Sequence, residues 1–192
     1  MTAIRYLISD SHLGHVRIRE YEPCRQAWGA DVLAMTETMI NAWNEVVKPE
    51  DTVLHLGDFM LGPKTAWADY RRRLNGKIIL VRGNHDPSKD SKHWALLEPL
   101  EVYSSYAFTL HTPDSALRVI CRHDPHEFTL EEFERADILA HGHLHSGKHR
   151  EDTPEYLRSK CVCLSVERLP TMPAPMPLSE LVNLFRSQHA EP

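Results

Sequence analysis

Five short apolar runs in this sequence are each followed by residues whose side chains could bind a metal ion. In chain order, these residues are Asp10 and His12, Asp58, Asn84 and His85, His123, and His143 and His145. Their carboxylate, imidazole and amide groups offer the oxygen and nitrogen atoms that borderline divalent cations accept. Any one of them alone would be interpreted as a cap, a turn or a surface residue, so the information lies in the repetition.

The spacing within two of these groups indicates joint binding of a single ion. Asp10 and His12 are two residues apart, as are His143 and His145. In extended chain, residues two apart point to the same side. The candidate ligands outnumber those of one tetrahedral site. We therefore expect two divalent ions that share a carboxylate, with Mn preferred and Fe, Zn, Ni or Co as alternatives.

The apolar runs are the elements that must position these residues, and we expect each to be a buried strand. The predicted strands cover residues 4–8, 52–56, 78–82, 102–110, 117–121, 138–140 and 161–166. Helical patterns separate several of them, which predicts an α/β fold. Open α/β sheets bind ligands at the carboxyl ends of their strands. The five groups are therefore expected to meet at one edge.

A helix is predicted over residues 31–47. Its apolar stripe at helical spacing comprises Leu33, Thr36, Ile40, Trp43 and Val47. The helix should end before Pro49, because the residue preceding a proline avoids the helical region. We assign this stripe to the core rather than to chemistry, and expect a second helix over residues 63–74.

The C-terminal half contains two further helix signals. Thr129 and Glu132 form the pattern of a capping box, and Phe128 with Phe133 forms that of a hydrophobic staple. Residues 170–177 contain four prolines and are expected to form a stiff connector after the last strand. Ser179 is then expected to cap a terminal helix.

Composition limits the class of protein. The 192 residues predict one domain spanning 1–192, with ordinary hydrophobic and charged fractions of 42% and 26%. A net charge of -5 argues against a dedicated nucleic-acid binder. We see no membrane span or signal peptide. The four cysteines show no disulfide framework, so a reduced cytoplasmic protein is expected.

The ordered motifs resemble the five blocks of the calcineurin-like metallophosphoesterases. The blocks are Asp10-Ser11-His12, Gly57-Asp58, Gly83-Asn84-His85-Asp86, His123 and Gly142-His143-Leu144-His145. Within that superfamily the chain looks like the small single-domain bacterial and phage phosphoesterases, partly through Ser165-Val166-Glu167. The resemblance implies a metallophosphoesterase-type β-sandwich flanked by helices, with a dimetal site at the carboxyl ends of the strands.

The resemblance also implies a role for each site residue. One ion would be held by Asp10, His12 and His145. The other would be held by Asn84, His123 and His143. Asp58 would bridge the two ions, His85 would be the acid near the leaving group, and Asp86 would orient His85.

The implied reaction is hydrolysis of a phosphodiester or phosphomonoester by a hydroxide held between the two metals. His85 as imidazolium would protonate the leaving alkoxide. Gly83 is expected to let the chain turn sharply off its strand. Arg122 departs from the family pattern, where a small residue precedes the histidine, and could approach a substrate phosphate or point to solvent.

Two alternatives remain open. The chain could be a nuclease, although its acidic balance and lack of an accessory domain do not favour nucleic acid. It could also be a non-catalytic scaffold for protein binding, although such relatives typically lose ligand residues. The expected partner is a small-molecule phosphoester, and the oligomeric state is unknown. Five residues are plausible neighbours of the substrate, each equally compatible with packing or surface positions: His15, Arg17, Tyr21, Trp28 and Arg122.

Overall fold

A computed structural model describes residues 3–99, 101–147 and 149–189, and its strands form two sheets. The first sheet has the order β4-β3-β2-β1-β9, with β1 to β4 parallel and β9 antiparallel to β1. Its strands are β1 (Tyr6–Ile8), β2 (Thr52–His55), β3 (Lys77–Val81), β4 (Glu101–Tyr103) and β9 (Met176–Pro177). The described part of the chain thus places four parallel strands side by side.

The second sheet has the order β5-β6-β7-β8. Its strands are β5 (Tyr106–His111), β6 (Ala116–Cys121), β7 (Ile138–His141) and β8 (Cys161–Cys163). The pair β5 and β6 is antiparallel, whereas β6, β7 and β8 run parallel. The carboxyl ends of β6 and β7 therefore point the same way, as those of β1, β2 and β3 do in the first sheet.

The two sheets meet where β1 and β8 end. Ser9 forms a parallel bridge with Ser165, in which the Ser9 amide donates to the Leu164 carbonyl at 2.9 Å. Buried residues of both sheets, such as Leu54 of β2 and Val119 of β6, belong to one hydrophobic cluster. This junction brings strand ends from both sheets to the same place.

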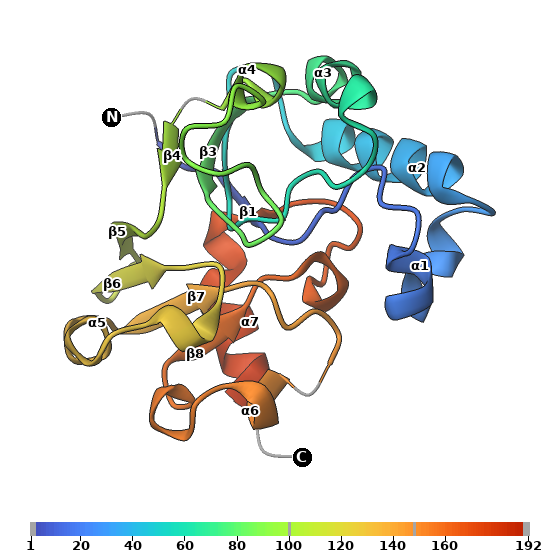
Figure 1. Cartoon of the computed structure of the whole chain (residues 1–192). Helices are drawn as coiled ribbons and strands as arrows, with labels where there is room; N and C mark the ends of the chain where they lie inside the picture. Colours follow the sequence, from blue (N-terminus) through green and yellow to red (C-terminus); the bar gives the residue numbers. More distant parts are fainter. Residues whose placement is uncertain (1–2, 100, 148, 190–192) are drawn as a thin grey trace.

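Helices flank the two sheets (Figure 1). They are α1 (Ile18–Tyr21), α2 (Val32–Val46), α3 (Lys64–Arg73), α4 (Trp94–Leu97), α5 (Leu130–Arg135), α6 (His149–Asp152) and α7 (Leu181–His189). In Figure 1, α2, α3 and α4 lie above the first sheet, and α7 lies below it near β7 and β8. The predicted class, an α/β fold with two sheets and flanking helices, is confirmed.

Helix α2 begins where the sequence predicts, and four of the five residues predicted for its buried stripe are buried, namely Thr36, Ile40, Trp43 and Val47. Asp31 caps it by accepting a hydrogen bond from the Ala34 amide at 2.8 Å. Residues Met35, Met39 and Trp43 lie at helical spacing and are at most 3% exposed. The prediction that Leu33 is part of the core is wrong, because this first-turn side chain points outward and is 63% exposed.

The capping box at Thr129 and Glu132 is confirmed at the start of α5. The Thr129 hydroxyl accepts from the Glu132 amide at 3.2 Å, and the Glu132 carboxylate accepts from the Thr129 amide at 2.9 Å. Phe128 and Phe133 pack in the same hydrophobic cluster. Local sequence therefore determines where this helix begins.

Two predictions of strands are wrong. Residues 102–110 do not form one strand, because the chain bends at Ser104 and Ser105 and passes from the first sheet to the second. The strand predicted over 161–166 ends at Cys163 and is not the last one. The proline-rich segment supplies the short strand β9 instead of serving only as a connector, and β9 pairs with β1 at the edge of the first sheet.

The terminal helix α7 is present, with Leu181 and Leu184 buried. Ser179 does not cap it as predicted, because Ser179 lies inside a 3-10 turn, η5 (Leu178–Glu180), that precedes the helix. Among the described residues, α2 is the longest helix at 15 residues. Since a membrane span requires about 20 apolar residues, no described helix has the length and apolarity to cross a bilayer.

Candidate metal centre

All nine predicted site residues lie just beyond the ends of β1, β2, β3, β6 and β7. Several of them line a cavity of about 410 Å³, among them His12, Asp58, His85, His143 and His145. Two groups of three side chains place their ligand atoms within 4.8 Å of one another. These groups are Asp10, His12 and His145, and Asp10, Asp58 and His123.

The first group is largely buried, with only His145 partly exposed. Asp10 is 0% exposed and His12 is 2% exposed. The Asp10 Oδ1 atom lies 4.0 Å from His12 Nε2 and 3.7 Å from His145 Nε2. Both ring nitrogens of His12 are buried without a hydrogen-bond partner in the described part of the chain. Buried polar atoms are normally satisfied, so an unpartnered imidazole facing two ligand-type groups fits a cation.

Asp58 stands between the two sides of the site. Its Oδ2 atom lies 3.6 Å from His12 Nε2 and 3.4 Å from His123 Nε2. The Asn84 Oδ1 atom lies 2.9 Å from His123 Nε2 and 3.1 Å from His143 Nδ1. A second set of nitrogen and oxygen atoms, from Asn84, His123 and His143, thus converges on the far side of Asp58.

The backbone at the site adopts an unusual conformation. Six described non-glycine residues have positive φ, and five of them are predicted metal ligands. The five are Asp10 (58°), His12 (47°), Asp58 (54°), His143 (68°) and His145 (48°). Each such conformation costs of order 1–3 kcal/mol and tends to persist where function requires it. The strain is concentrated where the side chains must be aimed at one point.

Burial and neighbouring charges shift the pKa values of the site residues in different directions. Burial lowers the pKa of His12 well below its usual value. Burial also acts on His123, but the hydrogen bond to Asp58 and the charges of Asp10 and Asp58 outweigh it and raise its pKa to about 10. Burial opposes ionisation of Asp58, yet His123 and His12 hold the pKa of that carboxyl far below its usual range. The site therefore favours an anionic Asp58 beside cations.

The loop after β3 is attached to the loop after β2 through Asp86. The carboxylate of Asp86 accepts hydrogen bonds from the amides of Gly83 (2.8 Å), Asp58 (2.9 Å) and Phe59 (3.0 Å). These three hydrogen bonds come from backbone amides rather than from the His85 ring. Asp86 therefore supports the loop that presents His85, a less direct role than the one expected.

Gly83 is required here for a different reason from the one expected. A Cβ atom on Gly83 would lie 2.2 Å from Asp58 Oδ1, so the two loops could not approach this closely with any other residue. The same holds for Gly142, where a Cβ would lie 2.4 Å from Asp10 Oδ2. Close backbone approach to the carboxylates, rather than a sharp turn, explains the glycine at position 83.

Behind His145 lies a buried ion pair that the site prediction missed. The Glu167 Oε1 atom lies 3.1 Å from His145 Nδ1 and accepts a hydrogen bond from Arg25 Nε at 2.6 Å. Arg25 is 0% exposed and also donates to the carbonyls of Asp10 (2.5 Å) and Ser11 (2.8 Å). The guanidinium thus joins the loop after β1 to the acid that orients His145.

Burial and the neighbouring charges oppose each other on this pair, and the charges prevail. Burial would lower the pKa of His145, but the hydrogen bond to Glu167 and the charge of Asp10 raise it. Burial would raise the pKa of Glu167, but His145 and Arg25 lower it. A carboxylate on Nδ1 leaves Nε2 to face Asp10, which is the usual arrangement behind a metal-binding histidine.

A second buried histidine, His55, holds the loop after β2. Its Nδ1 atom accepts from the Gly57 amide at 3.1 Å, and its Nε2 atom lies 2.6 Å from Ser11 Oγ. The amide contact requires a lone pair on Nδ1, so the proton is on Nε2. Burial lowers the pKa of His55 to about 3, and the ring remains neutral at ordinary pH.

Of the plausible substrate neighbours, the structure places His15 and Tyr21 in the metal-centre cavity. Arg17 stacks on Tyr21, with its guanidinium carbon 4.9 Å from the ring centre. Trp28 stacks on Arg25 and supports the ion pair. Arg122 takes neither of its two expected positions, because its Nε donates to the Glu132 carboxylate at 2.9 Å.

Comparison with known proteins identifies the family. Residues 6–159 match the calcineurin-like phosphoesterase superfamily domain. An uncharacterized protein of Methanocaldococcus jannaschii is 39% identical over 114 residues, which cover 58% of this chain and 60% of that protein. Gene 66 protein of Mycobacterium phage L5 is 28% identical over 166 residues, covering 73% and 77% of the two chains.

A solved structure shows the same fold. The crystal structure of a protein of unknown function from Aquifex aeolicus superposes with a TM-score of 0.66 and 26% identity, covering 95% of this chain and 100% of that one. The family match spans all five strands that precede the predicted ligands, namely β1, β2, β3, β6 and β7, together with the last histidine pair. The chain belongs to the calcineurin-like phosphoesterase superfamily.

Proposed function

We propose that this protein hydrolyses a phosphoester with the help of two divalent ions, with manganese the first to test. The observation that supports this most is the position of Asp58, whose Oδ2 lies 3.6 Å from His12 and 3.4 Å from His123. Asp10, His12 and His145 would hold one ion. Asn84, His123 and His143 would hold the other, and the carboxylate of Asp58 would serve both.

The donor set fits such ions. Carboxylate, imidazole and amide ligands suit Mn, Fe, Zn, Ni or Co. When bound, the ions would lower the pKa of water and neutralise charge on the phosphate. Asn84 contributes oxygen without negative charge, so only Asp10 and Asp58 offset the ions within these two groups. The site would remain attractive to an anionic substrate.

His85 is proposed to protonate the leaving group. Its amide donates to Asp58 Oδ1 at 2.9 Å, and its ring centre lies 5.7 Å from that of His12. The His85 side chain lines the cavity and is exposed, whereas the proposed ligands Asp10, His12 and Asp58 are buried. As water attacks phosphorus and the bond to the leaving oxygen breaks, His85 would give its proton to that oxygen. Its place at the rim suits proton exchange with solvent.

The substrate is proposed to be a small-molecule phosphoester. The cavity of about 410 Å³ is small, and Tyr21, Ile18 and Leu61 form part of its wall beside the histidines. An aromatic and apolar wall next to polar groups is typical of small-molecule sites. This arrangement supports binding of an organic group attached to the phosphate.

The test is a metal-supplemented panel of substrates. The protein would be stripped of metal, reloaded separately with Mn, Zn, Ni and Co, and assayed on phosphomonoesters, phosphodiesters, cyclic nucleotides and dinucleotides. We expect hydrolysis that depends on added metal. Absence of turnover with every metal and substrate, in protein that still binds metal, would contradict the proposal and favour the scaffold alternative.

His85→Ala separates chemistry from metal binding. We expect retained metal content and turnover lower by about 10²- to 10⁴-fold, the usual contribution of a general acid. The matched control is His111→Ala, an exposed histidine on β5 outside the cavity, which should leave both quantities unchanged. Unchanged turnover in His85→Ala would remove this residue from the reaction.

A further inference from the structure

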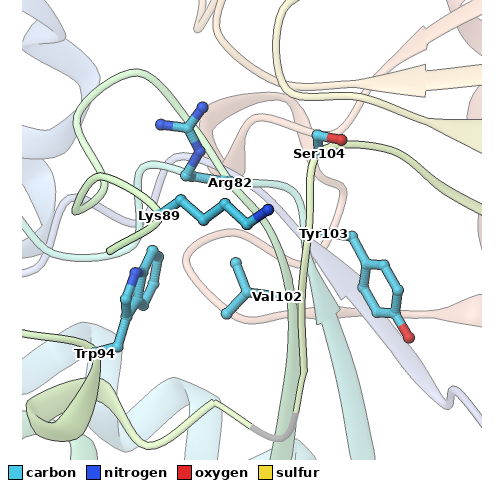
Figure 2. Close-up of a pocket in the computed structure, with 6 residues that line it drawn as sticks. All are labelled: Arg82, Lys89, Trp94, Val102, Tyr103 and Ser104. Carbon is cyan, nitrogen blue, oxygen red and sulfur yellow. The ribbon is translucent and has the colours of Figure 1, made fainter. Parts of the chain in front are cut away.

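A second cavity lies at the carboxyl edge of the first sheet, beside the strand that presents His85. Its volume is about 510 Å³, and Arg82, Lys89, Trp94, Val102, Tyr103 and Ser104 line it (Figure 2). Arg82 directly follows β3, and its amide donates to the Tyr103 carbonyl of β4 at 2.8 Å. We call this the β3–β4 cavity. It and the metal centre are built around the same loop.

The cations of the β3–β4 cavity are free to bind a ligand. Within the described part of the chain, neither Arg82 nor Lys89 forms a side-chain hydrogen bond or ion pair with a carboxylate. Glu101 on the neighbouring strand is engaged by the Tyr103 hydroxyl, and it alternates to the opposite face of β4 from Val102. Two unpaired cations at one cavity form an anion-binding surface.

Another cavity with arginines in its wall differs from the β3–β4 cavity in how its cations are paired. A cavity on the second sheet is also lined by Arg122 and Arg135. There, Arg122 is 2.9 Å from Glu132 and Arg135 is 2.8 Å from Glu131. Those two arginines already have carboxylate partners, which leaves Arg118 as the one arginine of that cavity without a side-chain partner among the described residues.

The walls of the β3–β4 cavity add an aromatic and an aliphatic surface. The Trp94 indole nitrogen donates to the Ser88 carbonyl at 2.9 Å, which fixes the ring. Val102 is 39% exposed at the cavity. In Figure 2, Lys89 extends across the cavity above Val102, with the Trp94 ring to one side and Arg82 beyond. A fixed aromatic face beside cations is the combination that binds a base and its phosphate.

We propose that the β3–β4 cavity binds a nucleoside phosphate, as the leaving-group portion of a phosphodiester cleaved at the metal centre. This inference rests on the proposed function. Arg82 precedes His85 by three residues, so their Cα atoms are at most about 11 Å apart. A leaving group that receives its proton from His85 therefore departs within reach of Arg82 and Lys89, whose charges hold its second phosphate.

The first experiment measures binding without catalysis. A thymidine dinucleotide with a 5′-phosphate is titrated calorimetrically into metal-free wild-type protein and into the double variant Arg82→Gln/Lys89→Gln. We expect binding about 10- to 100-fold weaker in the variant, the loss typical of charge-assisted hydrogen bonds. The control Arg72→Gln/Arg186→Gln removes the same charge from exposed positions on α3 and α7, and should bind as wild type.

Trp94→Leu tests the aromatic wall separately. It should weaken binding of the dinucleotide about 10-fold, as loss of one stacked base does, and leave binding of inorganic pyrophosphate unchanged. Equal affinity of wild type, the double variant and Trp94→Leu for the dinucleotide would overturn the proposal. Thermal unfolding of each variant checks that the fold is intact, which matters most for Trp94 because it is partly buried against the hydrophobic core.

Kinetics then distinguish this proposal from the proposed function. The double variant should lose about 10-fold or more in kcat/KM on the phosphorylated dinucleotide, and keep its rate on bis(4-nitrophenyl) phosphate, which has no second charge. Charge-dependent binding without hydrolysis of any substrate would retain the cavity assignment and reject the enzymatic one. Equal kinetic losses on both substrates would reject the cavity as a subsite.

The source of the nucleoside phosphate is determined by comparing the dinucleotide with a longer single strand. A strand that binds more tightly, with a steeper salt dependence, indicates nucleic acid as the source. Equal affinity for both ligands indicates a free nucleotide. Both conclusions require that the double variant binds its ligand more weakly than wild type does. If it does not, both conclusions are rejected.

Discussion

The two sides of the metal centre are built from similar side chains but are supported very differently. Asp10, His12 and His145 form a deep group, backed by the ion pair of Glu167 with the fully buried Arg25. Asn84, His123 and His143 form an open group, in which Asn84 is exposed and the His143 side chain is 35% exposed. Support behind a ligand fixes its direction before an ion arrives.

This difference suggests a division of labour. In the deep group, Asp10 and His145 are already oriented by hydrogen bonds to Ser165 and Glu167, which favours tight retention of an ion. The open group lies on the side of the loop that presents His85 and faces the solvent-accessible part of the site. We expect the ion of the open group to exchange more readily and to approach the substrate. Asp58 lies between the two groups and contacts a histidine of each.

Asp58→Asn should have the largest effect, because Asp58 Oδ2 lies within 3.6 Å of both His12 and His123. An amide would remove the negative charge that, in the proposed centre, holds two cations together. We expect loss of both ions and a fall in turnover of at least about 1000-fold, since metal contributes several kcal/mol. Elemental analysis and turnover on the same preparation measure this. Loss of a single ion would show that Asp58 serves only one of the two ions.

Glu167→Gln should affect the deep group selectively. Substitutions behind a metal-binding histidine typically reduce metal affinity 10- to 100-fold. Stepwise metal titration by calorimetry should show the tighter of two binding events weakened by about that amount, with the weaker event unchanged. Equal weakening of both events would contradict the asymmetry between the groups.

The control for Glu167→Gln must account for the arginine left behind. Arg25 is buried, and removing one partner of a buried ion pair costs of order 3–5 kcal/mol. The double variant Arg25→Met/Glu167→Gln removes both charges and should recover part of the lost stability in urea unfolding. It should not recover metal affinity, which separates orientation of His145 from folding.

Variants of His55 test whether the loop that carries Asp58 also depends on a neutral imidazole ring at position 55. Its pKa is about 3 in the folded protein and about 6.5 in an unfolded chain. The unfolded chain therefore takes up a proton between these values and the folded protein does not. Stability in metal-free protein should fall as pH decreases from 6.5 toward 3, by up to about 1.4 kcal/mol per pH unit.

His55→Gln should flatten that part of the pH dependence, because an amide does not titrate there. Urea unfolding between pH 4 and 7, compared with the exposed control His111→Gln, measures the difference. A wild-type slope that survives in His55→Gln would assign the effect to other groups, such as the similarly buried His12.

Local sequence patterns predicted much of the fold, and the candidate ligands they singled out lie close together in the structure. The candidate ligands directly follow buried apolar runs in the sequence. Their position next to these runs was therefore sufficient to identify them. The capping box at Thr129 followed from four consecutive residues. The split of residues 102–110 into β4 and β5 did not follow, because it depends on which sheet each half joins.

The support behind the deep group could not be predicted in the same way. Arg25 lies in a 3-10 turn, η1 (Pro23–Trp28), without periodicity, and its partner Glu167 is 142 residues away. Charged residues are usually exposed, so nothing local marks Arg25 as fully buried. Glu167 stood in the Ser165-Val166-Glu167 motif that resembles the family, which was the one available signal.

Arg122 should show the smallest effect, although it directly precedes a ligand of the open group. Its guanidinium is 20% exposed and turns away to Glu132, at the start of α5, rather than toward the cavity. Arg122→Gln should therefore lower stability by about 1 kcal/mol or less and leave kcat/KM and metal content near wild type. A large loss of activity with metal retained would place Arg122 at the substrate. It would also show that the open side of the site extends beyond His123 to the residue at the end of β6. The double-mutant cycle with Glu132→Gln measures how much of the small stability change belongs to the pair itself.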